Sequence, residues 1–229
     1  MSFKVVTPSI ASIAQWYKTM TGENVKENLK SIIAASGNYF ILDTGNLSTI
    51  TQYDKFHIYL GLDAGGALKL YAVPGANDKA ENINIYTLNL IPISVSFTKG
   101  KIEDTFANHQ DLIKNANNWL NEDELDKWID NVYSQENGNL IPLAFRIDAS
   151  DFKAGDVHAC YFALKFDDEL GFRNMDLVIA NTGPDQIPML LLDGTPYDKS
   201  SVFEDMARPV PPYDNDVEFG IFDQLNISY

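Results

Sequence analysis

The stretch FHIYLGLDAGGALKLYAV, residues 56–73, decides the fold class. Its first half places apolar side chains at every second position, which is typical of a strand with one buried face: Phe56, Ile58, Leu60 and Leu62. Residues 63–66 are turn sequence, and residues 68–73 are again rich in strand-forming side chains. Because strands joined by a short turn pair antiparallel, the stretch predicts a hairpin within an antiparallel sheet.

Two helices are expected before this hairpin. Apolar side chains recur at helical spacing from Ile10 to Met20, after a candidate N-cap at Thr7 and a proline at the first helical position. A second helix is expected from about Glu23 to Gly37, where glycine ends it. Residues 39–42 and 83–88 are expected to be strands that complete a meander with the hairpin.

The same order of elements recurs further along the chain. Helices are expected over residues 106–120 and 121–138, and the second of them starts with an acidic turn that suits the helix dipole. Strands are expected at Leu140–Ile147, Val157–Phe166, Leu177–Ala180 and Met189–Leu192, with Asp167–Glu169 at a hairpin tip. Offsets of 103, 100, 102 and 107 residues align the two series, and these offsets change only within expected loops.

We therefore expect an α+β protein in which helix pairs pack on antiparallel sheets, possibly as two similar helix–helix–strand halves. The halves are residues 1–100 and 101–200, and residues 201–229 form an acidic, proline-rich C-terminal tail packed on the body. Two unrelated segments with a similar order of elements are the alternative. The junction of two such halves is a usual place for a ligand cleft or a partner surface.

Composition excludes several classes of protein. The chain of 229 residues is 45% hydrophobic and 21% charged, as in an ordinary globular protein. Its 17 basic and 32 acidic residues give a net charge of −15, which repels phosphate and argues against nucleic-acid or anionic-membrane partners. No apolar run reaches the roughly 20 residues that span a bilayer. We expect a soluble cytoplasmic protein whose partner is a protein or a small molecule, with homo-oligomerisation left open.

Histidine and cysteine supply the first candidate catalytic residues. His158 and Cys160 are two positions apart in an expected strand, so they share a face, as a thiolate–imidazole pair requires. Cys160 nevertheless lies in an apolar strand of an acidic protein, which favours a buried, inert thiol. His57 falls on the face opposite Phe56 and Ile58 and is expected to be a half-buried, hydrogen-bonded side chain.

Metal and nucleotide sites have little support in the sequence. Asp214, Asp216 and Glu218 offer oxygen ligands at alternate positions, as calcium loops do. The segment lacks the glycine and glutamate that complete such a loop, so we expect no metal there. Gly61–Gly66 is followed by a strand rather than by a helix that could hold a pyrophosphate. We expect no cofactor.

The three tryptophans, Trp16, Trp119 and Trp128, are expected in the core, and the alternative is that they line a ligand pocket or partner surface. The absence of a nucleophile motif, metal spacing or phosphate loop favours a non-catalytic binding or assembly protein. The alternative is a hydrolase-type enzyme that uses Asp, His and Tyr residues at the junction of the halves. A cleft in which His57 or His158 reaches a carboxylate would favour the enzyme, whereas a filled core with an exposed apolar patch would favour the binder.

Overall fold

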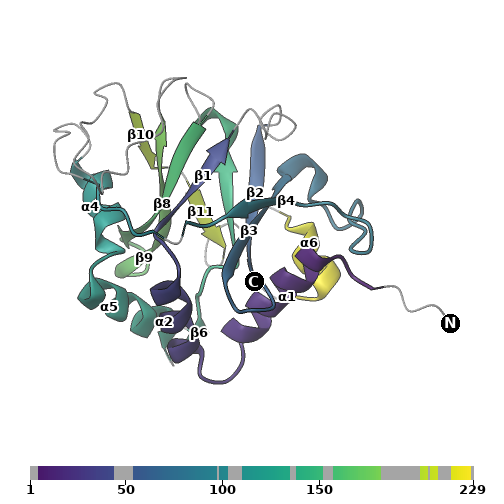
Figure 1. Ribbon diagram of the computed structural model, residues 1–229, viewed down its shortest axis with the longest axis horizontal. Helices are drawn as coiled ribbons and strands as arrows, with labels where there is room; N and C mark the ends of the chain where they lie inside the picture. Colours follow the sequence, from purple (N-terminus) through teal and green to yellow (C-terminus); the bar gives the residue numbers. More distant parts are fainter. Residues whose placement is uncertain are drawn as a thin grey trace.

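A computed structural model describes residues 5–43, 54–96, 98–102, 110–134, 138–151, 157–181, 202–205, 207–210 and 218–227. Helices pack on antiparallel sheets, which confirms the α+β class (Figure 1). No helix in these described ranges is long and apolar enough to cross a membrane.

The first two helices begin and end close to the predicted residues, whereas the helix expected over residues 121–138 ends at Val132 and the helix Gly220–Leu225 was not predicted. α1 spans Pro8–Met20 and α2 spans Val25–Ala35, while α4 is Gln110–Asn118, α5 is Glu122–Val132 and α6 is Gly220–Leu225. The Asn121 side chain accepts the backbone N–H groups of Asp123 and Glu124 and so caps α5. Thr7 precedes α1 as predicted, but its side chain makes no capping hydrogen bond.

In the described part of the chain, nine strands form two sheets in which every pairing is antiparallel. The first sheet has the order β1 (Tyr39–Asp43), β8 (Val157–Asp167), β9 (Phe172–Asn181) and β10 (Val202–Asp205). The second has the order β11 (Ala207–Val210), β7 (Ala144–Asp148), β2 (Lys55–Leu62), β3 (Leu68–Pro74) and β4 (Ile91–Ser94). Two short strands, β5 (Tyr133–Ser134) and β6 (Gly138–Asn139), pair separately.

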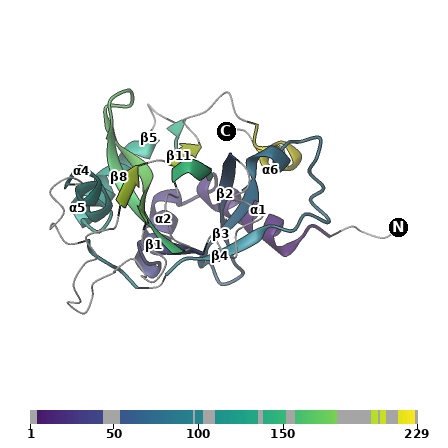
Figure 2. The ribbon, with the colours of Figure 1, turned by 90° about the horizontal axis from the view of Figure 1, so that it is seen from above.

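The two sheets share one apolar core. A bridge between Phe40 and Val95 links the edge strands β1 and β4, and β10 and β11 follow one another along the chain at the other edge. The largest buried cluster contains side chains from both sheets and continues to the helices, for example Ile10, Leu29, Phe162 and Phe222. A smaller cluster lies between α4 and the outer face of β8 and β9. The helices therefore cover the outside of the sheets, with α4 and α5 at one end and α6 at the other (Figure 2).

The prediction that the strands of each half pair in chain order is wrong, because the first strand of each half, β1 or β7, pairs with a strand of the other half. β1 pairs with β8 instead of β2, and β7 pairs with β2 instead of β8. Alternation along a strand specifies its buried face but not its neighbour, so the sequence pattern could not show the exchange. Strands from residues 1–100 and 101–200 thus lie in both sheets; the division into two halves and a tail stays a prediction.

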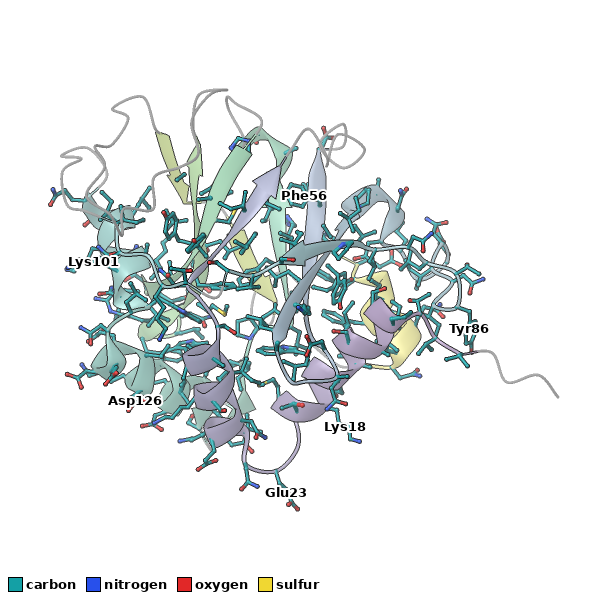
Figure 3. The ribbon with its side chains drawn as sticks, in the orientation of Figure 1. Lys18, Glu23, Phe56, Tyr86, Lys101 and Asp126 are labelled. Carbon is teal, nitrogen blue, oxygen red and sulfur yellow. The ribbon has the colours of Figure 1, made fainter. Side chains whose placement is uncertain are left out.

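The β2–β3 and β8–β9 hairpins pair their strands at corresponding positions. Leu60 lies opposite Leu70 in the β2–β3 pair, and Phe162 lies opposite Leu177 in the β8–β9 pair, at offsets of 102 and 107 residues. Between α2 and α5, Lys26 pairs with Asp130 and Lys30 with Asp126, each at 2.8 Å. Position 26 corresponds to position 126 and position 30 to position 130 at an offset of 100 residues, so each ion pair maps onto the other. Reciprocal contacts of this kind are typical of a two-fold interface. Figure 3 places Asp126 on α5, beside α2. Duplication of the halves stays a prediction.

Two expected strands need correction. Residues 83–88 form turns, because the Asn84 side chain accepts the N–H of Tyr86 and its carbonyl accepts those of Thr87 and Leu88. The strand expected at residues 140–147 becomes the shorter β7, since Pro142 lacks the N–H needed for a ladder. The strand expected at Met189–Leu192, and residues 103–109 of the third expected helix, lie outside the described residues.

Candidate functional site

The described part of the chain contains a buried cluster of His57, Asp78 and Tyr59. His57 Nδ1 lies 2.6 Å from Asp78 Oδ2, and the Tyr59 hydroxyl donates to the same oxygen. His57 and Tyr59 project from the outer face of β2, while Asp78 follows the short helical turn Gly75–Asn77 after β3. All three side chains are at most 2% exposed.

Helix α6 seals this cluster from solvent. The Phe219 ring stacks on His57 with centroids 4.3 Å apart, and Phe222 meets Tyr59 edge-on at 4.8 Å. The N–H of Ile221 donates to Asp78 Oδ1 at 3.2 Å. A Cβ on Gly220 would lie 2.4 Å from the backbone of Lys79, so only glycine permits this close approach.

A histidine held by a carboxylate is the arrangement in which a general base is oriented. Here the imidazole is covered by Phe219 and no substrate can reach it while α6 is docked. The expectation that His57 is half-buried is therefore wrong: packing against α6 buries it almost completely. The cluster acts as a buried polar tether between β2, the segment after β3, and α6.

The other catalytic candidates lie on the inner face of β8. Cys160 is opposite Phe40 and His158 is opposite Leu42, so the two share a face as predicted. The Cys160 side chain is fully buried, and burial raises the pKa of its thiol well above the ordinary range. A thiol in that environment is a poor nucleophile.

The three tryptophans are buried core residues in this structure, each at most 5% exposed. Trp16 Nε1 donates to the carbonyl of Pro142 at 3.1 Å, and Trp128 Nε1 donates to Asn174 Oδ1 at 3.2 Å. Trp119 packs between Trp128 and Phe162, with ring centroids 5.4 and 5.3 Å away. Their indole groups already have intramolecular partners, so their assignment as ligand-binding residues stays a prediction.

The candidate metal ligands are only partly described. Asp214 and Asp216 lie outside the described residues. Glu218 is described, and its Oε1 accepts the backbone N–H of Ala80 at 2.7 Å, next to the docked α6. Within the described ranges, no three His, Cys, Asp or Glu side chains come together as a metal site requires.

A groove of about 1040 Å³ lies between α1, α2 and the β2–β3 turn. The two helices diverge from the connection at Glu23, and the turn lies in the angle between them (Figure 1, Figure 3). Small or neutral polar residues form most of its wall, and the larger apolar groups are Pro8, Ile32, Leu62 and Tyr71. The small and neutral polar residues are Ala11, Ser12, Gln15, Thr19, Asn28, Ser31, Ala35, Ser36 and residues 64–67.

Charge is nearly absent from this groove, although the protein carries −15 overall. Among the described residues that line it, Asp63 is the one whose side chain is ordinarily charged at neutral pH. Its Oδ1 accepts the N–H groups of Ala67 and Gly65, and its other oxygen lies 3.4 Å from Lys69 Nζ. The N–H of Ala67, above all, lowers the pKa of this carboxyl. Its charge is thus already compensated within the hairpin.

The other hairpin shows why the groove is open. β2 and β3 pair up to Leu62 and Leu68 and then turn, whereas β8 and β9 continue for three further pairs beyond Leu164 and Met175. Three pairs add about 10 Å of hairpin. The added residues pack on α5: Arg173 Nε donates to Glu124 at 2.8 Å and Asn174 accepts from Trp128. At an offset of 100 residues, Asn28 of α2 corresponds to Trp128.

A second cavity of about 1040 Å³ runs along α4 and is lined by charged side chains that include Lys101, Asp111 and Lys114.

Sequence analysis missed the groove and the carboxylate partner of His57. A signal for the groove existed, because α1 and α2 each carry a second stripe of small or polar residues at helical spacing, beside the apolar one. Asp78 is 21 residues from His57 across a turn, and no spacing rule connects them. No family model matches the chain, and neither a curated protein nor a solved structure shows significant similarity to it.

Proposed function

We propose that this protein is a non-catalytic binding protein that holds an uncharged polar ligand in the groove between α1, α2 and the β2–β3 turn. The observation that carries the proposal is the open groove of about 1040 Å³ with its nearly uncharged wall. Its volume is at the upper end of what small-molecule sites usually have. The acidic exterior disfavours anionic partners, in agreement with this choice.

The lack of an accessible reactive group supports binding over catalysis. Within the described chain, the histidine–carboxylate contact is sealed by α6 and the Cys160 thiol is inside the core. Serine and threonine hydroxyls line the groove, but no histidine or free carboxylate lines it with them to activate a nucleophile.

A titration with small uncharged fragments that carry hydroxyl or amide groups tests the proposal. We expect the backbone amide chemical shifts of residues 11–36 and 62–71 to change on binding, because these two segments contain most of the residues that line the groove. Asn28→Trp should suppress the changes by filling the groove, and Ala34→Trp, on an exposed position of α2 outside the groove, should leave them unaltered. Shift changes centred on α6, or none at all, would contradict the proposal.

The second candidate function is a hydrolase centred on His57. It is favoured by one contact, the 2.6 Å distance from His57 Nδ1 to Asp78 Oδ2, and it requires α6 to leave. The test compares hydrolysis of activated esters by the native protein and by His57→Gln. We expect equal rates; a rate that depends on His57 would favour the enzyme.

A further inference from the structure

We propose that the ligand of the groove is a neutral polyhydroxylated molecule, a saccharide without charged substituents. This inference rests on the proposed function and adds the chemical class of the ligand. It is argued from the hydrogen-bonding groups of the wall, from its one aromatic ring and from the absence of available charge there.

The groove offers acceptors and hydroxyls instead of cations. Gln15 Nε2 donates to Thr19 Oγ1 at 3.4 Å and Asn28 Nδ2 donates to the carbonyl of Glu23 at 3.2 Å. In the described chain, the amide oxygens of Gln15 and Asn28 accept no hydrogen bond, so both are available to a donor. No lysine or arginine is among the described residues that line the groove, so these residues offer a phosphate or carboxylate ligand no counter-charge.

Hydroxyl groups on the ligand match the hydrogen-bonding groups of this wall. A hydroxyl donates one hydrogen bond and accepts up to two, so it can donate to the amide oxygens and also exchange hydrogen bonds with serine and threonine. Thr19 of α1, Ser31 of α2 and the C-cap residue Ser36 line the groove and supply such partners. An apolar ligand would desolvate these groups without replacing their hydrogen bonds to water.

Ser12 adds an unsatisfied hydroxyl at the base of the groove. The residue is 6% exposed, and its Oγ has no hydrogen-bond partner among the described residues. A buried hydroxyl without a partner costs about 1–3 kcal/mol. Oγ lies beside Gly61 of β2 and Ser12 lines the groove, so a ligand hydroxyl that reached Oγ would give it a partner.

Tyr71 supplies the apolar surface that a sugar ring requires. Its ring is half-buried in the wall and is held against the backbone of β2, where a Cβ on Gly61 would lie 2.8 Å from Tyr71 Cε2. The C–H face of a pyranose packs on such a ring while its hydroxyls point to the helices.

A peptide fits this groove less well. Peptides commonly bind to a sheet through free N–H and C=O groups of an edge strand. The β2–β3 turn has no such edge, because Asp63 and Ala67 pair with each other and the N–H of Gly66 donates to the Asp63 carbonyl.

The test uses the full chain and five probes: maltose, methyl glucoside, glucuronate, glucose 6-phosphate and an uncharged acetyl-Gly-Asn-Ser-Gly-amide peptide. Binding is followed by amide shift changes and by saturation transfer from the protein to the probe. We expect the two neutral sugars to shift Gly65 and Gly66, with dissociation constants of about 1–10 mM. We expect both charged sugars to bind at least about tenfold more weakly. Asn28→Trp should weaken maltose binding by about tenfold or more, and Ala34→Trp should leave it unchanged.

Two results would overturn the inference, and they are distinguishable. If the peptide shifts the groove amides and the neutral sugars do not, the saccharide class is wrong while binding in the groove stands. If none of the uncharged probes shifts them, the proposed function falls with the inference. Charged sugars that bind as tightly as neutral ones would also contradict it.

Discussion

The β2–β3 and β8–β9 hairpins share a cross-strand register and differ in length. The longer hairpin continues past Leu164 and Met175 and closes the angle next to α5 with Arg173 and Asn174. The shorter one turns at residues 63–67 and leaves the corresponding angle between α1 and α2 open. One framework therefore holds a filled end, which serves stability, and an open end, which is available to a ligand.

The largest expected effect is the difference in thiol reactivity between the buried core at Cys160 and the open groove at position 35. Cys160 should react with a maleimide at neutral pH about 10⁴-fold or more slowly than a thiol introduced by Ala35→Cys in a Cys160→Ala background. Burial raises the pKa of the Cys160 thiol, so labelling needs an opening of the core, whereas Ala35 is exposed in the groove. The rates are compared by mass spectrometry. Similar rates would show that the core around β8 opens readily.

The next effect concerns the filled end. Trp128→Asn gives α5 the residue that α2 has at the corresponding position, and it should lower the free energy of unfolding by about 3–5 kcal/mol because a buried indole is lost. The reverse change, Asn28→Trp, enters the open groove and should alter the free energy of unfolding by about 1 kcal/mol or less. Both are measured by urea denaturation. Equal costs would contradict the difference between the two ends.

A third prediction compares how α4 and α6 are held on the sheets. α4 covers β8 through apolar contacts, such as Ile113 and Ala116 in the cluster under this helix, whereas α6 is tethered through Asp78. Asp78→Asn should cost about 2–3 kcal/mol, because a buried carboxylate with hydrogen bonds from His57, Tyr59 and Ile221 is lost. Asp223→Asn, on the exposed side of α6, is the control. An unchanged urea midpoint for the Asp78 variant would refute the tether.

The smallest expected effect is the change in the free energy of unfolding when the ion pair between Glu124 and Arg173 of the longer hairpin is removed. The Lys127 hydrogen bond and then the Arg173 hydrogen bond lower the pKa of Glu124. Because its folded-state pKa is below the unfolded one, its contribution is present at neutral pH and is lost as the pH falls through the folded value. Glu124→Gln should therefore cost about 1 kcal/mol or less at pH 7 and less still near pH 3. Urea unfolding at both pH values measures this, with Glu81→Gln, an exposed carboxyl, as control. A cost that grows on acidification would reverse the assigned sign.

Local elements could be predicted because local sequence specifies them. Pro8 and Gly22 bound α1, turn residues follow Leu62, and the hairpin tip expected at residues 167–169 lies at the end of β8. The inward direction of Cys160 and the outward direction of His57 followed from strand alternation.

Partners distant in sequence could not be predicted in this way. The pairing of β1 with β8 joins strands more than 100 residues apart, and alternation is compatible with many neighbours. The expected strand at residues 83–88 failed because the Asn84 side chain closes a turn, which outweighs the alternation around it. The groove depends on where each hairpin stops relative to two helices, which is a tertiary property.

The docking of α6 has a consequence for the synthesis of this chain. Glu218 and Ala80 are 138 residues apart, and the outer face of β2 at His57 stays uncovered until Phe219 and Phe222 have left the ribosome. Until then, the His57 and Tyr59 side chains lack the ring contacts that α6 supplies in the folded protein. A chain shortened before residue 218 would therefore lack the two aromatic rings that cover His57 and Tyr59.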